Sequence, residues 1–276
     1  MAANLLHSMS HFVELIDALL DRCNPKCIVE IGSEYGDSTR ALASHAKQNA
    51  AMLHVIDPRP KIDPDIALKD FDGAYKFHRK KSVDALPGIA GDMFVIDGDH
   101  NYWTVFTELR LIYEHNPRAW VVLHDVGFPW ARRDLYYDPE EIPIAHRHPY
   151  SHEHGVDLKT DEIRHRSGFW GAGEYAIALE SDTPKNGVLT AVEDFLADKV
   201  NLRYGSIPLI FGMGVIVPEH HEKFVAELLR PYQGLLCAAL ERNRLDLYSD
   251  YLDLTHKLHG TFVRRWANRL MDRLGV

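Results

Sequence analysis

The sequence lacks the features that would assign it at once to a membrane, secreted or nucleic-acid-binding class. No stretch approaches the ~20 apolar residues that cross a bilayer. Residues 1–10 have neither the basic start nor the apolar core of a signal peptide. The net charge of −9 argues against nucleic acid as the main partner, and three cysteines are too few for a disulfide framework. We therefore expect a reduced, cytoplasmic enzyme.

The sequence does contain a regular alternation of short apolar runs and helical patterns. Its 276 residues, 46% of them hydrophobic, suffice for one large α/β domain or a domain with an appendage. Such alternation predicts a Rossmann-like α/β fold, with a seven-stranded, mostly parallel sheet, flanking helices and an antiparallel strand near one edge. The expected strands are 27–31, 52–56, 75–80, 93–96, 120–123, 202–207 and 211–217, and the expected helices are 12–21, 38–47, 82–86, 102–113 and 188–199.

Two segments fall outside this alternation. Residues 127–173 contain four prolines and no periodic pattern, which predicts a long lid, and residues 175–179 are either a strand or part of that lid. Residues 219–276 are predicted to be helical throughout, as a C-terminal helical extension of a domain that spans residues 1–218. Their leucines at helical spacing favour a homodimer through these helices, although one chain could also bury the same stripe.

A glycine turn joins the first expected strand to the following helix. From Glu30 to Gly36 the pattern is E-x-G-x-x-x-G, which differs from the G-x-G-x-x-G that brings a pyrophosphate onto a helix. A carboxylate on the strand is a poor neighbour for a pyrophosphate and a good one for a cation or for ribose hydroxyls. The spacing therefore favours S-adenosylmethionine over NAD, with a plain glycine turn as the structural alternative.

Acidic residues stand at or near the ends of four expected strands, namely Glu30, Asp57, Asp97 and Asp125. Ligands of parallel sheets bind at the carboxyl ends of the strands. We therefore expect these carboxylates to belong to one site, with Asp57 placed to accept hydrogen bonds from ribose.

Five motifs stand in order along the chain, VEIGS at 29–33, GDST at 36–39, VID at 55–57, VIDGDHNY at 95–102 and LHDV at 123–126. Together they resemble the class I S-adenosylmethionine-dependent methyltransferases. The most similar branch is the small-molecule O-methyltransferases similar to macrocin O-methyltransferase and the cephalosporin hydroxylase family. The resemblance covers about residues 25–217. It implies a cofactor site made of Glu30, Gly32, Ser33, Gly36, Thr39, Asp57, Ser82, Asp97, Asp99 and His100.

The resemblance also implies roles for some of these residues. Glu30 and Gly32 would line the methionine and ribose side of the cofactor, and Asp57 would bind the ribose diol. Ser82 would lie near the adenine. The remaining pair, Asp99 and His100, would lie beside the cofactor or the substrate mouth.

A divalent metal is also implied, held by acids after the fourth and fifth strands. Asp97 and Asp125 fit this pattern, and oxygen ligands suit Mg²⁺. His124 stands where a third carboxylate is expected, and imidazole suits Mn²⁺, Fe²⁺ or Zn²⁺ better. The metal candidates are thus Asp97, His124 and Asp125, and the catalytic candidates are Asp97, His124 and His100. Without a metal, His124 or His100 would act as the general base, or His124 would only bind the backbone.

The lid contributes further candidates. Four histidines, His146, His148, His152 and His154, could bind zinc, but without cysteine support a polar lid surface is favoured. Cys23 and Cys27 could form half of a metal site, but the chain has no second thiol pair. Arg132 and Arg133 would meet an anionic acceptor or remain solvated. The aromatic residues expected to grip a ring-bearing acceptor, or to form core beneath the lid, are Trp130, Tyr136, Tyr137, Phe169 and Trp170.

The leading prediction is methyl transfer from S-adenosylmethionine to a hydroxyl of a small molecule, with or without a metal such as Mg²⁺ or Mn²⁺. By resemblance, the acceptor is a glycosylated or polyketide-like metabolite of natural product biosynthesis. The alternatives are methyl transfer to nitrogen, an NAD-dependent oxidoreductase, and a non-catalytic cofactor-binding module.

Overall fold

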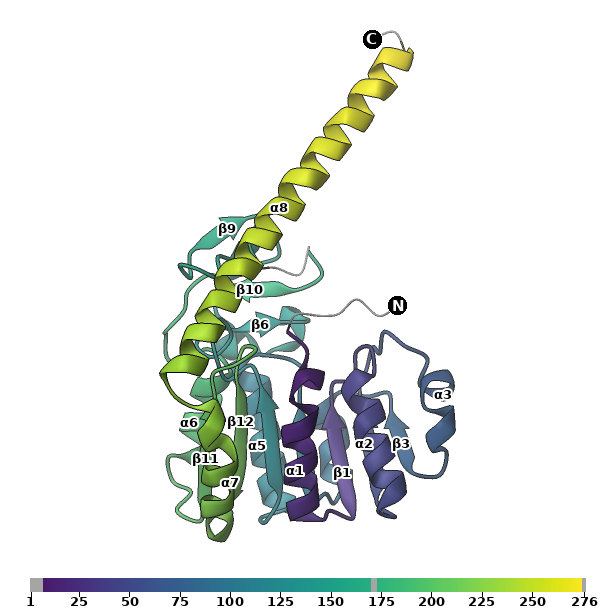
Figure 1. The fold of residues 1–276 in the computed structure, drawn as a ribbon, viewed down its shortest axis with the longest axis vertical. Coiled ribbons are helices and arrows are strands. Elements are labelled where there is room, and N and C mark those ends of the chain that lie inside the picture. The colour runs from purple at the N-terminus through teal and green to yellow at the C-terminus, as the bar shows by residue number, and fades with distance from the viewer. Residues whose placement is uncertain (1–6, 170–172, 275–276) are drawn as a thin grey trace.

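A seven-stranded sheet forms the centre of the chain, with helices on both faces, a lid at one edge and a long C-terminal helix (Figure 1). The computed structural model describes residues 7–169 and 173–274, with residues 259–274 as helix backbone only. None of the helices in this part of the chain combines the length and apolar character needed to cross a bilayer.

The sheet has the strand order β3-β2-β1-β4-β5-β12-β11. All neighbouring pairs are parallel except those made by β12, which runs antiparallel to both β5 and β11. The predicted sheet, including its antiparallel strand near one edge, is therefore confirmed. The strands are β1 (Cys27–Ile31), β2 (Met52–Ile56), β3 (Tyr75–His78), β4 (Met93–Ile96), β5 (Trp120–His124), β11 (Leu202–Ile207) and β12 (Met213–Pro218).

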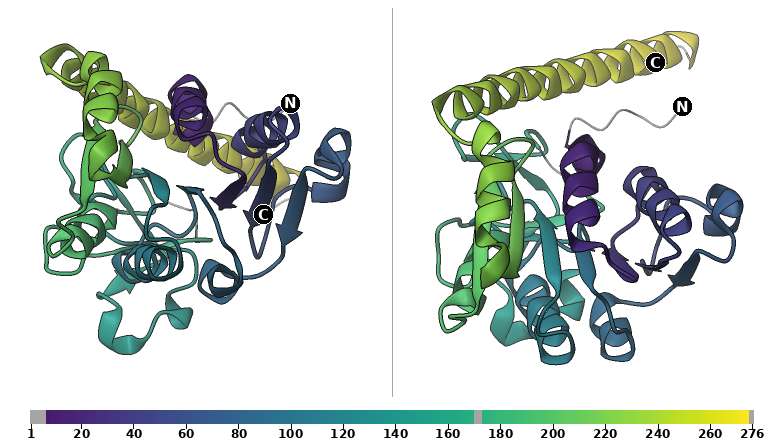
Figure 2. Two further views of the ribbon diagram at one scale, coloured as in Figure 1. Left: turned by 90° about the horizontal axis from the view of Figure 1, so that it is seen from below. Right: turned by 60° about the horizontal axis from the view of Figure 1, so that its bottom comes forward.

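Helices cover the two faces of the sheet separately (Figure 2). One face carries α1 (Val13–Cys23), α2 (Asp37–Gln48) and α7 (Glu222–Leu229), and the other carries α4 (Ser82–Ala85), α5 (Tyr102–His115) and α6 (Val188–Leu196), while α3 (Pro64–Ala67) lies beyond the β3 edge. Short 3-10 helices are η1 (Met9–Phe12), η2 (Lys69–Phe71), η3 (Leu86–Gly88), η4 (Pro139–Glu141), η5 (Ile144–His146), η6 (Glu219–His221) and η7 (Arg230–Tyr232).

Two apolar layers hold these helices to the sheet. Successive side chains of a strand point to opposite faces, so Val95 and Val122 join the layer under α1, α2 and α7, whereas Phe94 and Val121 join the layer under α5 and α6. Both layers are buried, which explains why the central strands are continuous apolar runs rather than alternating ones.

The lid contains more regular structure than the sequence indicated. Strands β6 (Leu135–Tyr136), β10 (Ala176–Ala178) and β7 (Tyr150–Ser151) form a three-stranded antiparallel sheet, and β8 (His154–Val156) pairs with β9 (Ile163–His165). Strands of two or three residues are too short to show a period of two, so the pattern gave no sign of them. The segment 175–179 contributes β10, the middle strand of this three-stranded sheet, so the strand expected there is confirmed.

The C-terminal region is helical, but it is interrupted. After α7 and η7 the chain turns at Gly234, whose φ is +116°, and then enters α8 (Leu235–Leu274). Val225 and Leu229 of α7 belong to the sheet core, so α8 alone leaves the sheet. Its first half lies along the lid and its second half projects away from the body of the molecule (Figure 1). Residues 275 and 276 lie outside the described residues.

Gly32, directly after β1, permits the close approach of β1 and β4 at the ligand edge of the sheet. Its φ is +86°, and a Cβ added there would lie 2.1 Å from the Asp97 carbonyl oxygen. Both the backbone conformation and the space therefore require glycine.

We expect Gly32→Ala to destabilise the protein far more than Gly73→Ala. Gly73 has a similar φ of +81° but nothing within 4 Å of an added Cβ. Its substitution should therefore lower the free energy of unfolding only by the cost of a left-handed alanine, about 1–2 kcal/mol. Urea unfolding of both variants measures the difference, which we expect to be several kcal/mol because the β1–β4 contact must open. An equal loss of unfolding free energy in the two variants would show that the close approach of β1 and β4 is not needed.

Candidate active site

The register of the central strands brings two candidate residues together. Ile31 of β1 pairs with Ile96 of β4, and Ile96 pairs with Leu123 of β5. The residues that follow, Asp97 and His124, therefore lie side by side at the carboxyl edge of the sheet, where parallel sheets bind ligands.

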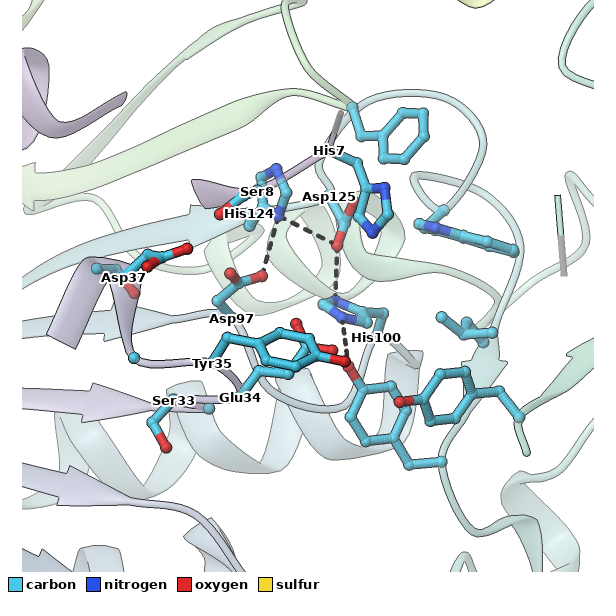
Figure 3. A pocket seen from close by; sticks show the side chains of 18 of the residues that line it. His7, Ser8, Ser33, Glu34, Tyr35, Asp37, Asp97, His100, His124 and Asp125 are labelled. Carbon is cyan, nitrogen blue, oxygen red and sulfur yellow. Dashed lines mark hydrogen bonds and ion pairs between the residues drawn. The ribbon is translucent and has the colours of Figure 1, made fainter. Parts of the chain in front are cut away.

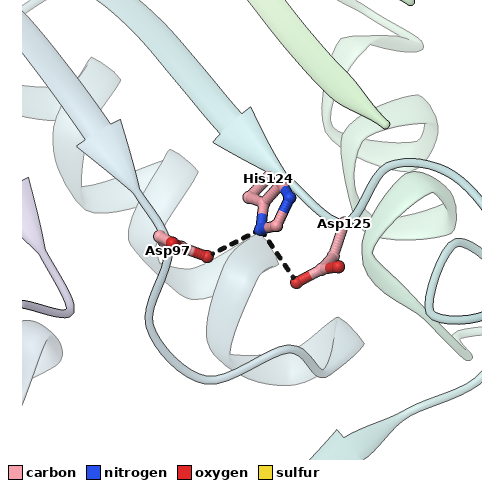
Figure 4. Close-up of side chains that lie close together, drawn as sticks. All are labelled: Asp97, His124 and Asp125. Atoms are coloured by element: carbon pink, nitrogen blue, oxygen red, sulfur yellow. Dashed lines mark hydrogen bonds and ion pairs between the residues drawn. The ribbon is translucent and has the colours of Figure 1, made fainter. Parts of the chain in front are cut away.

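Asp97, His124 and Asp125 form one compact group (Figure 4). The Nδ1 atom of His124 lies 2.9 Å from Asp97 Oδ1 and 3.4 Å from Asp125 Oδ2. Asp125 takes a left-handed φ of +59°, which is uncommon for a residue with a side chain. Its Oδ1 atom is buried and has no hydrogen-bond partner among the described residues. The group therefore retains one acceptor atom, Asp125 Oδ1, that no described residue uses.

The charge of this group depends on the His124 ring. Burial alone would lower the pKa of His124, but Asp125 and Asp97, with hydrogen bonds to Asp97 and the Ile210 carbonyl, raise it to about 9. In the protein alone, His124 is thus a cation near pH 7 that bridges two carboxylates. Burial opposes ionisation of Asp125 too, yet His124 and His100 lower its pKa.

His100 extends the group toward the lid. Its Nδ1 atom lies 2.8 Å from Asp125 Oδ2, and its Nε2 atom lies 3.2 Å from the hydroxyl of Tyr137. Burial alone would lower the pKa of His100, but Asp125 raises it above its usual value. The candidate bases His100 and His124 thus share one carboxylate, that of Asp125.

Two adjoining cavities open at this edge of the sheet. The first, about 220 Å³, is lined by the metal candidates and by aromatic residues (Figure 3), and the second, about 510 Å³, lies over the ends of β1, β2 and β4. Asp97 lines both, so the acidic group stands at their junction. The other residues common to the two cavities are Gly32, Glu34, Tyr137 and Tyr175.

Asp57 holds the glycine turn in place. Its Oδ2 atom accepts hydrogen bonds from the Ser33 amide at 3.0 Å, the Ser33 hydroxyl at 2.8 Å and the Glu34 amide at 3.1 Å, and its Oδ1 atom accepts from the Arg59 amide at 2.8 Å. Asp57 lines the second cavity, yet much of its acceptor capacity already serves the loop.

Most of the predicted cofactor residues line a cavity, but Glu30 and Thr39 do not. Glu30 is 1% exposed and accepts from the Ser38 hydroxyl at 2.8 Å, beneath the start of α2, and Thr39 is fully buried beside it. Burial raises the pKa of Glu30 to about 8, so near pH 7 it is mostly uncharged. The role of Glu30 on the methionine and ribose side of the cofactor stays a prediction. The predicted residues that do line a cavity are Gly32, Ser33, Gly36, Asp57, Ser82, Asp97, Asp99, His100, His124 and Asp125.

Ser82, which the resemblance places near the adenine, and Asp99, which it places beside the cofactor or the substrate mouth, both line the second cavity. Asp99 accepts from the Tyr137 amide at 3.1 Å and the Thr104 hydroxyl at 3.2 Å, and burial raises its pKa to about 6. Glu108, which the sequence analysis missed, lines the same cavity, and burial raises its pKa to about 8. This cavity thus holds acids that titrate much closer to neutrality than free ones.

Aromatic side chains form the wall of the first cavity. Trp130, Tyr137 and Phe169 line it as expected, whereas Tyr136 is fully buried in the lid and Trp170 lies outside the described residues. His7 and Phe211 also line it, and no sequence pattern pointed to either. The His7 ring lies 3.1 Å, through Nδ1, from the Tyr248 hydroxyl of α8, and burial lowers the pKa of His7 to about 4. Figure 3 shows His7 beside Asp125 at the top of the cavity.

The lid histidines and arginines lie elsewhere. Among the described residues, the only cluster of histidine, cysteine and acidic side chains compact enough to hold a metal is Asp97, His124 and Asp125, which leaves out His146, His148, His152 and His154. Cys23, Cys27 and Cys237 are all free thiols. Arg132 makes two bonds to Glu193, at 2.6 and 2.8 Å, and Arg133 is buried against Asp161 and the Ala178 carbonyl. Neither arginine lines a cavity.

The donor atoms of the Asp97 group fit a divalent ion. Ligands on one octahedral Mg²⁺ or Mn²⁺ ion lie about 3 Å apart, and tetrahedral zinc ligands about 3.4 Å apart. The observed separations of 2.9 and 3.4 Å fall in this range. The unpartnered Asp125 oxygen adds an acceptor. A mixed set of one imidazole and two carboxylates suits Mn²⁺, Fe²⁺ or Zn²⁺ better than Mg²⁺.

Comparison with known families places this region. The model of a family described as "Methyltransferase domain" matches residues 29–126, from β1 to just past β5. That segment contains Gly32, Asp97, His124 and Asp125. A search of curated proteins finds no match to the chain.

Several solved structures are similar to this chain. A methyltransferase from Podospora anserina bound to S-adenosylhomocysteine has 16% identity, covers 79% of this chain and 80% of its own, and gives a TM-score of 0.48. An O-methyltransferase of tomaymycin synthesis from Streptomyces achromogenes, in complex with S-adenosylmethionine, has 16% identity, coverages of 77% and 82%, and a TM-score of 0.46. A methyltransferase from Geobacter sulfurreducens has 11% identity, coverages of 78% and 81%, and a TM-score of 0.45.

The burial of Glu30 predicts a pH-dependent stability. Because its pKa is about 8 in the folded protein and near 4.5 in the unfolded chain, the stability it contributes is full below pH 4.5 and is lost as the pH rises through 8. We expect Glu30→Gln to remove this loss. Between pH 5 and 8 the free energy of unfolding of the variant should therefore rise relative to that of the wild type, by up to about 1 kcal/mol per pH unit. Urea unfolding at several pH values measures it, with exposed Glu14→Gln as the control. A constant difference between Glu30→Gln and wild type would contradict the burial argument.

Proposed function

We propose that the chain, whose residues 29–126 match the model of a family described as "Methyltransferase domain", is a class I S-adenosylmethionine-dependent methyltransferase that transfers a methyl group to a hydroxyl oxygen of a small molecule, assisted by a divalent metal. The observation that carries this proposal is the convergence of Asp97, His124 and Asp125 at the junction of two cavities. We further propose a cytoplasmic location, which three free cysteines support.

The second cavity suits the nucleoside. Its volume of about 510 Å³ lies within the range of small-molecule sites. Trp103, Ile56 and Ile142 offer apolar surface for a base, while Ser82 and Asp99 offer polar atoms at its edge. Gly32 lies at the junction with the first cavity, where the methionine end would lie. When bound, S-adenosylmethionine supplies the methyl group on a positively charged sulfur.

The first cavity suits a ring-bearing acceptor. Trp130, Phe169 and Phe211 offer apolar faces that exclude water, and Asp97, His124 and Asp125 lie on the polar side. When bound there, a metal ion lowers the pKa of an acceptor hydroxyl, so that its oxygen is present as the anion near neutral pH. The protein's own part is to hold that oxygen about 3 Å from the methyl carbon and in line with the sulfur. We propose a glycosylated or polyketide-like metabolite as the acceptor, which the aromatic wall supports.

Near neutral pH the bridging proton on His124 must leave before Nδ1 can bind a metal. His100 and Asp125 lie beside that position and provide a route to the Tyr137 hydroxyl, which lines both cavities. Metal binding should therefore release about one proton and tighten as the pH rises toward 9.

We expect S-adenosylmethionine and S-adenosylhomocysteine, but not NAD, to raise the melting temperature, and Mn²⁺ to add a further increment. Asp125→Asn should abolish the Mn²⁺ increment and keep the response to S-adenosylhomocysteine, because Asp125 lines the first cavity and not the nucleoside cavity. Thermal shift measures both. Calorimetry at pH 6.5 and 8.5 measures the pH dependence, with tighter Mn²⁺ binding expected at pH 8.5.

The control is Asp37→Asn, an exposed acid of the first cavity outside the metal group, which should keep both responses. A response to NAD alone would indicate an oxidoreductase. Transfer of labelled methyl from S-adenosylmethionine to amine-bearing but not hydroxyl-bearing ring compounds would contradict the choice of oxygen. Cofactor binding without transfer to any acceptor would favour a non-catalytic module.

We also propose that two copies of the chain pair through α8. Leu240, Leu247 and Leu254 recur every seven residues on its exposed side, with Tyr251 and Leu258 between and after them, each more than half exposed. This spacing is that of a coiled-coil seam. The seam lies about 130° around the helix from the buried face that packs on the lid. Together with Leu236 it exposes roughly 600–700 Å² of apolar surface, close to the ~800 Å² per partner of a stable interface.

We expect the double variant Leu247→Glu, Leu254→Glu to be monomeric where the wild type is dimeric, because four charges would enter the seam. Light scattering after gel filtration measures the mass. Leu235→Glu is the control, since Leu235 is 91% exposed but lies off the seam, and it should remain dimeric. A monomeric wild-type protein would overturn the proposed pairing.

A further inference from the structure

The loop between β11 and β12 is held in an unfavourable conformation. Ile210, Phe211 and Gly212 have φ values of +51°, +63° and +89°, three left-handed residues in succession. Left-handed conformations are uncommon for residues with a side chain, and a β-branched residue such as Ile210 is a genuine outlier there. Such conformations persist only where the surrounding structure holds them.

Glu241 of α8 is the group that holds this loop. Its carboxylate accepts hydrogen bonds from the Ile210 amide at 3.0 Å and the Phe211 amide at 3.2 Å. Glu241 is 6% exposed, and Arg244 neutralises it through bonds of 2.6 and 2.7 Å. On the other side, the Gly127 amide donates to the Phe211 carbonyl at 2.6 Å.

The Ile210–Gly212 loop contacts the Asp97–His124–Asp125 group through one atom. The Ile210 carbonyl oxygen lies 2.9 Å from Nε2 of His124. A carbonyl can only accept, so Nε2 carries a hydrogen, and Nδ1 is the ring nitrogen turned toward Asp97 and Asp125. A backbone carbonyl that fixes the orientation of a ligating histidine in this way also tunes its metal affinity.

We propose that Glu241 is a positioning residue for the Asp97–His124–Asp125 group, acting through the Ile210–Gly212 loop. Glu241 lines neither cavity, so it acts on the site only through this loop and the His124 ring. The arrangement couples α8 to the metal group, and this part of the inference rests on the proposed function. The orientation of the ring does not rest on it.

The test compares Glu241→Gln with Asp246→Asn. A glutamine carbonyl can accept a hydrogen bond from one of the two loop amides, but its NH₂ group can only donate and so cannot bind the other amide. The loop therefore loses one of its two hydrogen bonds to residue 241. Asp246 is a partly buried acid on the same helix that lies 3.7 Å from Arg242 and does not contact the loop. The measurements are calorimetric titrations with Mn²⁺ and with S-adenosylhomocysteine, and ¹⁵N NMR of the His124 ring.

For Glu241→Gln we expect the Mn²⁺ dissociation constant to rise about tenfold or more, with that for S-adenosylhomocysteine within twofold of wild type. The Nε2 proton of His124 should shift and exchange faster with water. Asp246→Asn should change none of these. Parallel loss of Mn²⁺ and S-adenosylhomocysteine binding would show a merely structural role, and an unchanged His124 ring in a folded Glu241→Gln protein would overturn the proposal.

A second measurement needs no variant. Since coupling is reciprocal, Mn²⁺ binding to the wild-type protein should slow hydrogen exchange at the Ile210 and Phe211 amides several-fold. The Ala238 amide of α8, which donates to the Gly234 carbonyl just before the helix and not to Glu241, is the internal reference. No slowing in a protein that binds Mn²⁺ would also overturn the proposal. If the wild type binds no Mn²⁺, the proposed metal fails, and the His124 signals of Glu241→Gln alone decide the positioning role.

Discussion

The contact between Gly32 and the Asp97 carbonyl is the constraint on which the site depends. It lets the ends of β1 and β4 lie within van der Waals distance of each other. Because β4 pairs in parallel register with both β1 and β5, the end of β5 lies beside them. Asp97 and His124 become neighbours because the strands that carry them are in step, without any loop between them. The turn after β1 is fixed in the same way from the other side, by the Asp57 carboxylate at the end of β2. Both cavities open from this one edge.

Burial divides the acids of the site into two kinds. For Glu30 and Glu108, desolvation outweighs every favourable contact, so it raises their pKa values to about 8 and leaves them mostly neutral near pH 7. Asp125 lies between two histidines, which lower its pKa despite the same burial. The ionised carboxylate of Asp125 thus lies where a metal or a sulfonium would need it. The left-handed backbone of Asp125, which costs about 1–2 kcal/mol, is part of what this arrangement requires.

The sequence predicted both the sheet and the proximity of Asp97, His124 and Asp125, because both depend on where the strands end. It could also have excluded Glu30 from the cavity, since Glu30 shares the face of Ile28, which packs toward α2. His7 and Glu241 are different. Each lies more than 100 residues from His124, and each reaches the site through contacts that leave no periodic trace in the sequence. The lid strands were missed because two or three residues cannot display a period, and the neutral state of Glu30 follows from packing alone.

The His124 ring is held by the Ile210 carbonyl, and the Ile210 amide in turn is held by Glu241. This has a consequence for the order in which the chain folds during synthesis. Residues 97, 124 and 125 emerge from the ribosome well before β12, which must then insert between β5 and β11 to complete the sheet. Glu241 and Tyr248 emerge later still, so the His124 ring and the His7 side of the cavity are fixed last. Until then the nascent chain has the acidic ligands without their final geometry. The candidate site is therefore complete only after α8 has been synthesised.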